Sequence, residues 1–259
     1  MTQPAIFVSH GSPMHALEPG PAGEAWAALG RRAGKPRAIL IASAHWETER
    51  PIFTGAARPQ TIHDFYNFPE PLYRLRYPAP GAPELALHAK ELLLKAGFGA
   101  EIDRERGLDH GAWAPLLYMY PDADVPVVQL SLQPALGPRH HFEVGKALRP
   151  LRDENVLVIG SGHLTHNLRD WARGQGAPAP YAREFQSWVY ERIASRKSEE
   201  LIGYRSLSAH GVRAHPTDEH FLPLFVALGA AGEDEAERVY DAIDSGVLAM
   251  DAYYFGARS

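Results

Sequence analysis

The chain has 259 residues, of which 45% are hydrophobic, 22% charged and 10% aromatic, values typical of a folded globular protein. Its net charge of −5 argues against a nucleic-acid-binding protein, and the absence of cysteine excludes disulfides, thiolate nucleophiles and cysteine-ligated metals. The longest apolar run, 38–44, is far shorter than the roughly 20 residues of a membrane span. With no secretory signal apparent, we expect a cytoplasmic protein.

Apolar and amphipathic segments alternate along the chain. In chain order we expect a strand at 4–9, a helix at 22–33, strands at 37–44 and 51–55, a long loop at 57–81, helices at 83–96 and 111–120, a strand at 125–132, a helix at 138–150, a strand at 155–160, helices at 180–196 and 218–230, and strands at 237–243 and 247–255. Thr217 or Asp218 is the expected N-cap of the helix at 218–230. This alternation predicts an α/β fold, with a single domain over residues 1–259 and a central, mostly parallel or mixed sheet flanked by helices.

The expected loop at 57–81 is rich in proline and aromatic residues. Loops of this length inside a compact domain tend to be functional or disordered, and the aromatic content indicates an ordered one. Its aromatic side chains favour a flat ring over a peptide as the substrate.

Histidine is unusually frequent, with 13 residues in the chain. Four histidines follow three different predicted strands: His10, His45, His163 and His166. Another, His220, is expected in the first turn of a helix, where free backbone N–H groups disfavour an imidazolium ion. Sites in open α/β sheets form at the carboxyl ends of strands, and imidazoles without cysteine suit Zn, Fe, Cu or Ni. A single histidine at a strand end is usually structural, but this set predicts a metal site.

The remaining signals are weaker. His110 directly precedes a predicted helix and is either a residue of the cap region or a site residue. His140 and His141 lie at a helix start and are expected to face solvent. The segment G-S-G-H at 160–163 does not match the G-x-S-x-G nucleophile motif, which disfavours a serine hydrolase.

Eight short motifs occur between residues 9 and 224. They are S-H-G-S-P-M at 9–14, S-A-H-W at 43–46, T-I-H-D-F at 61–65, Y-P-A-P-G at 77–81, D-H-G-A-W at 109–113, Y-P-D-A-D-V-P-V-V-Q-L-S at 120–131, T-H-N-L at 165–168 and E-H-F-L-P-L at 219–224. The ordered set resembles the DODA-type (4,5-DOPA) extradiol dioxygenases of the class III extradiol ring-cleavage superfamily. S-H-G-S alone is not specific, because chelatases carry a similar motif.

The resemblance implies a non-haem Fe(II) enzyme that inserts O₂ into a catechol beside its two hydroxyls and gives a ring-opened semialdehyde. Residue by residue, it implies that His10, His45 and His220 are metal ligands. Better-known members of the superfamily use two histidines and one carboxylate. Here Glu219, the neighbour of His220, is the carboxylate that would have to rotate in. All-nitrogen ligation makes Zn²⁺ a second candidate for the bound ion.

The resemblance also implies roles for three further histidines. His166 matches a histidine that is either a further metal ligand or the catalytic acid/base, and His110 is expected to assist it. His63 and His110 are expected to contact the substrate. His163 departs from the pattern of the family and is expected to be a bystander.

Two alternatives stay open from the sequence alone. A zinc-dependent hydrolase or a chelatase would use the same histidines but would not need O₂. A non-catalytic scaffold relative would be expected to have lost ligands, whereas all four candidate ligands are present: His10, His45, His166 and His220. The expected partners are a small catechol and O₂, with no nucleic acid and no membrane.

Overall fold

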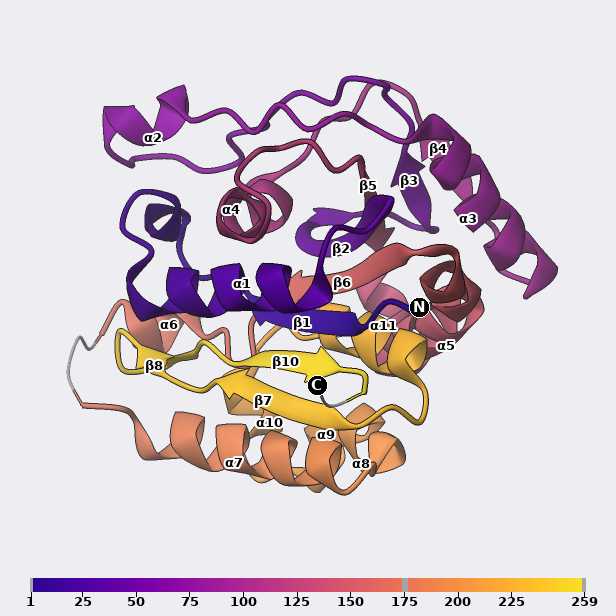
Figure 1. Cartoon of the computed structure of the whole chain (residues 1–259). Coiled ribbons are helices and arrows are strands. Elements are labelled where there is room, and N and C mark those ends of the chain that lie inside the picture. Colours follow the sequence, from indigo (N-terminus) through magenta and orange to yellow (C-terminus); the bar gives the residue numbers. More distant parts are fainter. Residues whose placement is uncertain (1, 174–176, 258–259) are drawn as a thin grey trace.

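The computed structural model describes residues 2–173 and 177–257, and is built around an eight-stranded mixed sheet (Figure 1). The strand order is β4-β3-β5-β2-β6-β1-β10-β7. The central strands run parallel to one another: β5 (Val127–Leu132), β2 (Ala38–Glu47), β6 (Val156–Gly162) and β1 (Ala5–Ser9). The outer strands are β4 (Glu101–Asp103), β3 (Ile52–Thr54), β10 (Ala252–Phe255) and β7 (Ala236–Tyr240). The prediction of a mostly parallel or mixed sheet is confirmed.

Alternate residues of the central strands face two different cores. In β1, Ile6 and Val8 pack on one side of the sheet, whereas Ala5 and Phe7 pack on the other. Helices α1 (Gly20–Ala33) and α4 (His110–Met119) cover the first side. The second side is covered by α3 (Pro83–Lys95), α5 (Gly137–Leu148), α7 (Pro180–Ala194) and α11 (Leu222–Ala231). Helices on both faces explain the nearly continuous apolar strands.

Several short elements were not predicted from the sequence. The expected loop at 57–81 contains α2 (Glu70–Arg74). Other short elements are α6 (Leu168–Trp171), α8 (Ser198–Ile202), α9 (Tyr204–Leu207), α10 (Gly211–Ala214) and the 3₁₀ turns η1 (Pro13–Ala16), η2 (Pro134–Leu136) and η3 (Arg149–Glu154). The expected final strands are divided, with β8 (Ile243–Asp244) and β9 (Leu248–Ala249) forming a separate small sheet. Segments this short are below the length at which hydrophobic periodicity is informative.

Three neighbouring parallel strands end at one edge of the sheet. Ser9 of β1 pairs with Gly162 of β6, and Ser43 of β2 pairs with Ser161 of β6. Strand β2 continues to Glu47 instead of ending at residue 44, so His45 lies within the strand. The pairing of β2 with β5 shifts register between Ala42 and Glu47, which places His45 in an irregular stretch.

The last long helix begins later than predicted. Helix α11 starts at Leu222, and its N-cap, Phe221, makes no side-chain hydrogen bond, so the prediction of Thr217 or Asp218 as the N-cap was wrong. Pro223 has no N–H to donate to the carbonyl of Glu219, so the helix cannot extend backward through these residues. His220 therefore lies in the turn before α11 and not in its first turn.

No helix among the residues that the structure describes combines the length and the apolar character that crossing a bilayer requires.

Candidate metal centre

Besides His15 of η1, six histidines line a cavity of about 620 Å³: His10, His45, His110, His163, His166 and His220. His10 follows β1, and His45 lies near the end of β2. His110 is the first residue of α4, and both His163 and His166 follow β6. His220 lies in the turn before α11. The structure therefore brings together the histidines that the sequence placed at the ends of separate strands.

Two glycines allow the backbone segments of the site to approach closely. A Cβ atom at Gly111 would lie 2.4 Å from Ser43 Oγ, so no larger residue fits between α4 and β2. A Cβ atom at Gly162 would lie 2.2 Å from the carbonyl oxygen of His220, which also accepts a hydrogen bond of 2.7 Å from His163 N. Close backbone packing thus fixes the positions of the site residues.

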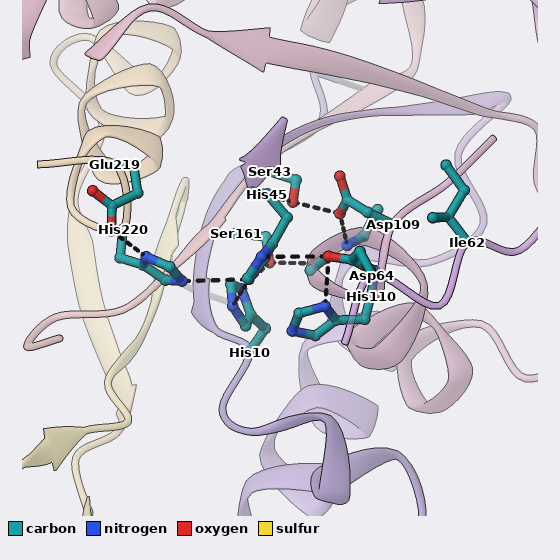
Figure 2. A network of polar contacts seen from close by, with 12 residues as sticks. His10, Ser43, His45, Ile62, Asp64, Asp109, His110, Ser161, Glu219 and His220 are labelled. Atoms are coloured by element: carbon teal, nitrogen blue, oxygen red, sulfur yellow. Dashed lines mark hydrogen bonds and ion pairs between the residues drawn. The ribbon is translucent and has the colours of Figure 1, made fainter. Parts of the chain in front are cut away.

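The Nε2 atoms of three histidines converge (Figure 2). Nε2 of His45 lies 3.0 Å from Nε2 of His10 and 3.3 Å from Nε2 of His220. Nitrogen ligands around a tetrahedral zinc ion lie about 3.3 Å apart, given Zn–N distances of about 2.0–2.1 Å. The observed spacing therefore fits nitrogen atoms that share one small cation.

The hydrogen bond of His10 determines which of its nitrogens carries the proton. Nδ1 of His10 lies 3.0 Å from Ser161 Oγ, and this hydroxyl donates its own proton to the carbonyl of Gly111. Ser161 Oγ therefore accepts a hydrogen bond from His10 Nδ1–H. The neutral imidazole of His10 then has its lone pair on Nε2.

In the other two histidines, His45 and His220, a carboxylate lies next to Nδ1. Nδ1 of His220 lies 2.9 Å from Glu219 Oε1, and Nδ1 of His45 lies 3.4 Å from Asp64 Oδ2. Because an ionised carboxylate only accepts hydrogen bonds, the 2.9 Å contact gives His220 its proton on Nδ1 and its lone pair on Nε2. The longer contact of His45 is not a hydrogen bond of that length, but the negative charge of Asp64 favours the same tautomer. Metal-ligating histidines commonly donate their second N–H group in this way.

Burial lowers the pKa of His10, His45 and His220 well below the usual range, and neighbouring imidazoles lower it further. All three are therefore neutral at pH 7, with no proton between their Nε2 atoms. Three lone pairs at these distances repel one another unless a cation lies between them. The donor set thus fits a divalent ion that prefers imidazole, such as iron or zinc.

His110 is a fourth imidazole beside this point. Its ring centroid lies 4.0 Å from that of His45, and the ligand atoms of His10, His45 and His110 lie within 4.8 Å of one another. Nδ1 of His110 donates to Asp64 Oδ2 at 2.9 Å, which leaves its Nε2 free. His110 therefore completes one possible group of ligands with His10 and His45, and the direct Nε2 contact to His45 favours His220 over His110 as the third ligand.

His166 lies beside this triad. Its ring stacks on that of His220, with centroids 3.4 Å apart and planes inclined by 15°. Its Nδ1 lies 3.7 Å from Glu219 Oε1, which is beyond hydrogen-bond distance. Burial, together with the nearby His110, lowers the pKa of His166 to about 4. A neutral imidazole is therefore present next to the convergence point.

Aromatic side chains also line the cavity. Phe65, Tyr66 and Phe68 come from the segment predicted as a long loop, and Trp171 comes from α6. The side chain of Tyr66 is 82% exposed, which places it at the cavity mouth. These walls provide flat apolar surfaces against which an aromatic ring can stack.

Two of the expected positions differ in the structure. His63 does not line this cavity; its ring lies edge-on to Phe65 with centroids 5.7 Å apart, and Nε2 lies 3.1 Å from Leu75 O. The prediction that His63 contacts the substrate stays a prediction. His141 was expected to face solvent, but it is buried beneath the start of α5, whereas His140 is half-buried. A helix start is not exposed when a sheet and other helices pack over it.

Sequence reasoning missed the residues that orient the imidazoles. The sequence indicates no role for Asp64, and it indicates Glu219 only as a carboxylate that could replace a histidine ligand. Both occur directly beside a histidine in a motif, Asp64 in T-I-H-D-F and Glu219 in E-H-F-L-P-L. A carboxylate next to a histidine in a motif is the sequence signal for a residue that orients an imidazole. The sequence does not show which imidazole the carboxylate contacts.

The fold and the histidine cluster fit an aromatic ring-opening dioxygenase, and the family to which the chain belongs shows this class. The chain matches the family of the catalytic LigB subunit of aromatic ring-opening dioxygenase over residues 4–255, and it belongs to this family. The prediction of a ring-opening dioxygenase of the extradiol class is thereby confirmed.

Relatives from distant organisms carry the same function in their names. The chain is 43% identical to 4,5-DOPA dioxygenase extradiol of Beta vulgaris, over 96% of this chain and 95% of the relative. It is 40% identical to 4,5-DOPA dioxygenase extradiol of Escherichia coli K12, over 98% of this chain and 94% of the relative. The crystal structure of an uncharacterized protein from Escherichia coli K12 superimposes with a TM-score of 0.84, at 36% identity, covering 98% of this chain and all of the other.

Proposed function

We propose that residues 1–259 form one catalytic domain that cleaves a small DOPA-like catechol next to its two hydroxyls, using O₂. His10, His45 and His220 hold the metal ion, which is Fe²⁺ in the active enzyme, and Zn²⁺ competes for the same ligands. The observation that carries this proposal is the convergence of three Nε2 atoms on histidines whose Nδ1 atoms face a hydroxyl or a carboxylate instead.

The nature of the reaction favours iron over zinc. Zinc has no redox chemistry, whereas cleavage by O₂ requires electrons to pass between catechol and oxygen. When bound, Fe²⁺ would supply Lewis acidity toward both catechol oxygens and a route for these electrons. The chain itself must bind the ring, keep water away and move the protons.

His166 and His110 are the proposed acid/base pair. His166 is neutral and can accept a proton from a catechol hydroxyl, and the imidazolium that forms is stabilised by Glu219, whose Oε1 lies 3.7 Å from His166 Nδ1. His110 keeps its proton on Nδ1, facing Asp64, and presents Nε2 as a second acceptor. A protonated imidazole can later return its proton to a developing oxyanion.

The cavity walls favour a single flat ring with a short side chain. Phe65 and Phe68 can pack against the ring, while Tyr66 and Trp171 lie on the more exposed side of the cavity. The relatives are named for cleavage of 4,5-DOPA, and we propose the same class of catechol for this chain. Location in the cytoplasm stays a prediction.

The test is O₂ uptake after anaerobic reconstitution with Fe²⁺, using DOPA and a small panel of catechols while the visible spectrum is recorded. We expect substrate-dependent O₂ uptake and a yellow ring-opened product. The protein reconstituted with Zn²⁺ is the matched control and should consume no O₂. Lack of uptake by protein shown to contain iron would overturn the proposal and favour an O₂-independent hydrolase with the same ligands.

A further inference from the structure

Two carboxylates beside the histidine cluster, Asp64 and Glu219, each lie between two histidines. Figure 2 shows Asp64 with His45 and His110, and Glu219 with His220. Asp64 lies between a proposed metal ligand, His45, and a proposed acid/base residue, His110. Glu219 repeats this arrangement on the other side of the site, between the ligand His220 and the acid/base residue His166. The side chains of Asp64 and Glu219 are 21% and 16% exposed, so both are largely shielded from water.

The distances within the two arrangements are reversed. Asp64 Oδ2 lies 2.9 Å from His110 Nδ1 and 3.4 Å from His45 Nδ1, so its shorter bond is to the acid/base residue. Glu219 Oε1 lies 2.9 Å from His220 Nδ1 and 3.7 Å from Nδ1 of the acid/base histidine, so its shorter bond is to the metal ligand. Only the contacts near 2.9 Å have the length of a charge-assisted hydrogen bond.

The geometry points to a division of labour between these positioning residues: Asp64 fixes the orientation and tautomer of the acid/base residue His110, and Glu219 fixes those of the metal ligand His220. This inference rests on the proposed function for the roles of the two histidines. Ligand atoms of His166, Glu219 and His220 also lie within 4.8 Å of one another. The inference nevertheless makes Glu219 a positioning residue and not a metal ligand, because its Oε1 is hydrogen-bonded to Nδ1 of His220.

Asp64 has a second contact that makes its hold on His110 rigid. Its Oδ1 accepts a hydrogen bond of 2.9 Å from the backbone N of His110, the first residue of α4. Backbone N–H groups in the first turn of a helix have no partner within the helix, so the carboxylate satisfies one of them. Asp64 therefore holds both the backbone and the imidazole of the same residue.

This double contact makes Asp64→Asn an informative variant. The backbone N–H of His110 can only donate, so the amide oxygen must face it, and the amide NH₂ group then faces His110 Nδ1. An NH₂ group there requires a lone pair on Nδ1 and moves the imidazole proton to Nε2. The variant therefore blocks the atom that must accept the substrate proton while leaving the three metal ligands in place.

The experiment compares Asp64→Asn with Glu219→Gln, using Glu184→Gln as the control. Glu184 accepts a hydrogen bond from His210 at 2.6 Å on the exposed surface, so it is a carboxylate–histidine pair outside the cavity. Metal affinity is measured without substrate by competition with a chelator, and kcat and KM are measured with DOPA at saturating Fe²⁺. Imidazole tautomers are read from ¹⁵N chemical shifts of the zinc-loaded protein.

We expect Glu219→Gln to weaken metal binding by about tenfold or more, the typical effect of removing a carboxylate behind a ligand histidine, with a smaller change in kcat at saturating metal. Asp64→Asn should leave metal affinity within about threefold, lower kcat by roughly 100-fold and shift the His110 signals to the Nε2–H tautomer. Asp64→Glu, which restores a carboxylate, should recover part of kcat. The control should change neither quantity.

Equal effects of the two variants on metal affinity and on kcat would overturn the inference, as would an unchanged His110 tautomer in Asp64→Asn. Failure of the proposed function is distinguishable from these results. If no protein consumes O₂ with any catechol, the metal affinities and ¹⁵N shifts still show whether the two carboxylates act on different histidines.

Discussion

Buried histidines occur in two regions of this molecule, and they differ in what their nitrogen atoms contact. Burial lowers the pKa of His141 and His215, which lie outside the cavity, to about 3, just as it lowers that of the cavity histidines. Both nitrogens of His141 have partners, because Nδ1 donates to Gly137 O at 2.7 Å and Nε2 accepts from Gln133 N at 3.0 Å. A strongly lowered pKa therefore marks burial and does not by itself identify a site.

His215 shows that a free nitrogen is also not sufficient. Its Nε2 donates to Leu164 O at 2.8 Å, and its Nδ1 is buried without a hydrogen-bond partner among the described residues. Its ring stacks on Phe221 with centroids 4.6 Å apart, and Phe185 packs against its edge. What distinguishes the cavity is the convergence of several free lone pairs at ligand spacing.

The largest expected effect follows from removing one converging nitrogen. His45→Ala should abolish detectable O₂ uptake and lower the metal content of the purified protein severely, because both short Nε2 contacts involve His45. Metal content is measured by elemental analysis, and retention of the fold by circular dichroism. Normal metal content in this variant would remove His45 from the site.

The next largest effect is expected from His166→Ala, which distinguishes a metal ligand from an acid/base residue. His166→Ala should retain most of the metal, because His166 stacks on a ligand and does not share the Nε2 contacts. Its kcat should fall by about 10²–10⁴-fold, the usual contribution of a general acid/base residue. Loss of metal to the same extent as in His45→Ala would instead identify His166 as a ligand.

Replacing a buried histidine outside the cavity, such as His141, should have a moderate effect, and only on stability. His141→Ala leaves the backbone N–H of Gln133 without its partner and removes the side-chain hydrogen bond to Gly137 O, so it should lower the free energy of unfolding by about 1–3 kcal/mol. Metal content and kcat of the folded protein should stay unchanged. Urea denaturation measures the first quantity, and a substantial loss of metal would contradict the distinction between the two regions.

The sequence was most informative where strands and histidines coincide. The apolar strands β1, β2 and β6 predicted that their carboxyl ends meet at one edge of the sheet. They thereby predicted that the histidines following them, His10, His45, His163 and His166, lie close together. It was less informative at His220, where Pro223 moves the helix start beyond the expected N-cap. It also could not assign Asp64 to its imidazoles, because this contact joins residues 46 positions apart in the chain. Contacts of this kind depend on how a loop packs, and periodicity does not encode loop packing.

The smallest expected effect extends the comparison to a buried carboxyl group. Burial raises the pKa of Asp251 to about 7, although Gln186 donates to it at 2.6 Å and Tyr253 at 3.2 Å. Its pKa in the unfolded chain is about 3.9, so the folded state binds the proton more tightly, and the free energy of unfolding falls as the pH rises from about 4 to about 7. Between pH 6 and pH 8 the wild type should lose about 1 kcal/mol relative to Asp251→Asn.

Denaturation at a series of pH values measures this difference, while kcat at each pH should be the same in both proteins. A pH-independent difference in stability would show that Asp251 does not change its protonation in this range. A change in kcat would show that a buried group outside the cavity acts on the site, and the distinction between the two regions would then fail for carboxyl groups. If the stability falls as the pH rises while the ratio of the two kcat values stays constant, the conclusion drawn from His141 also holds for carboxyl groups. Burial alone then shifts a pKa, whereas a functional site requires several free lone pairs that converge.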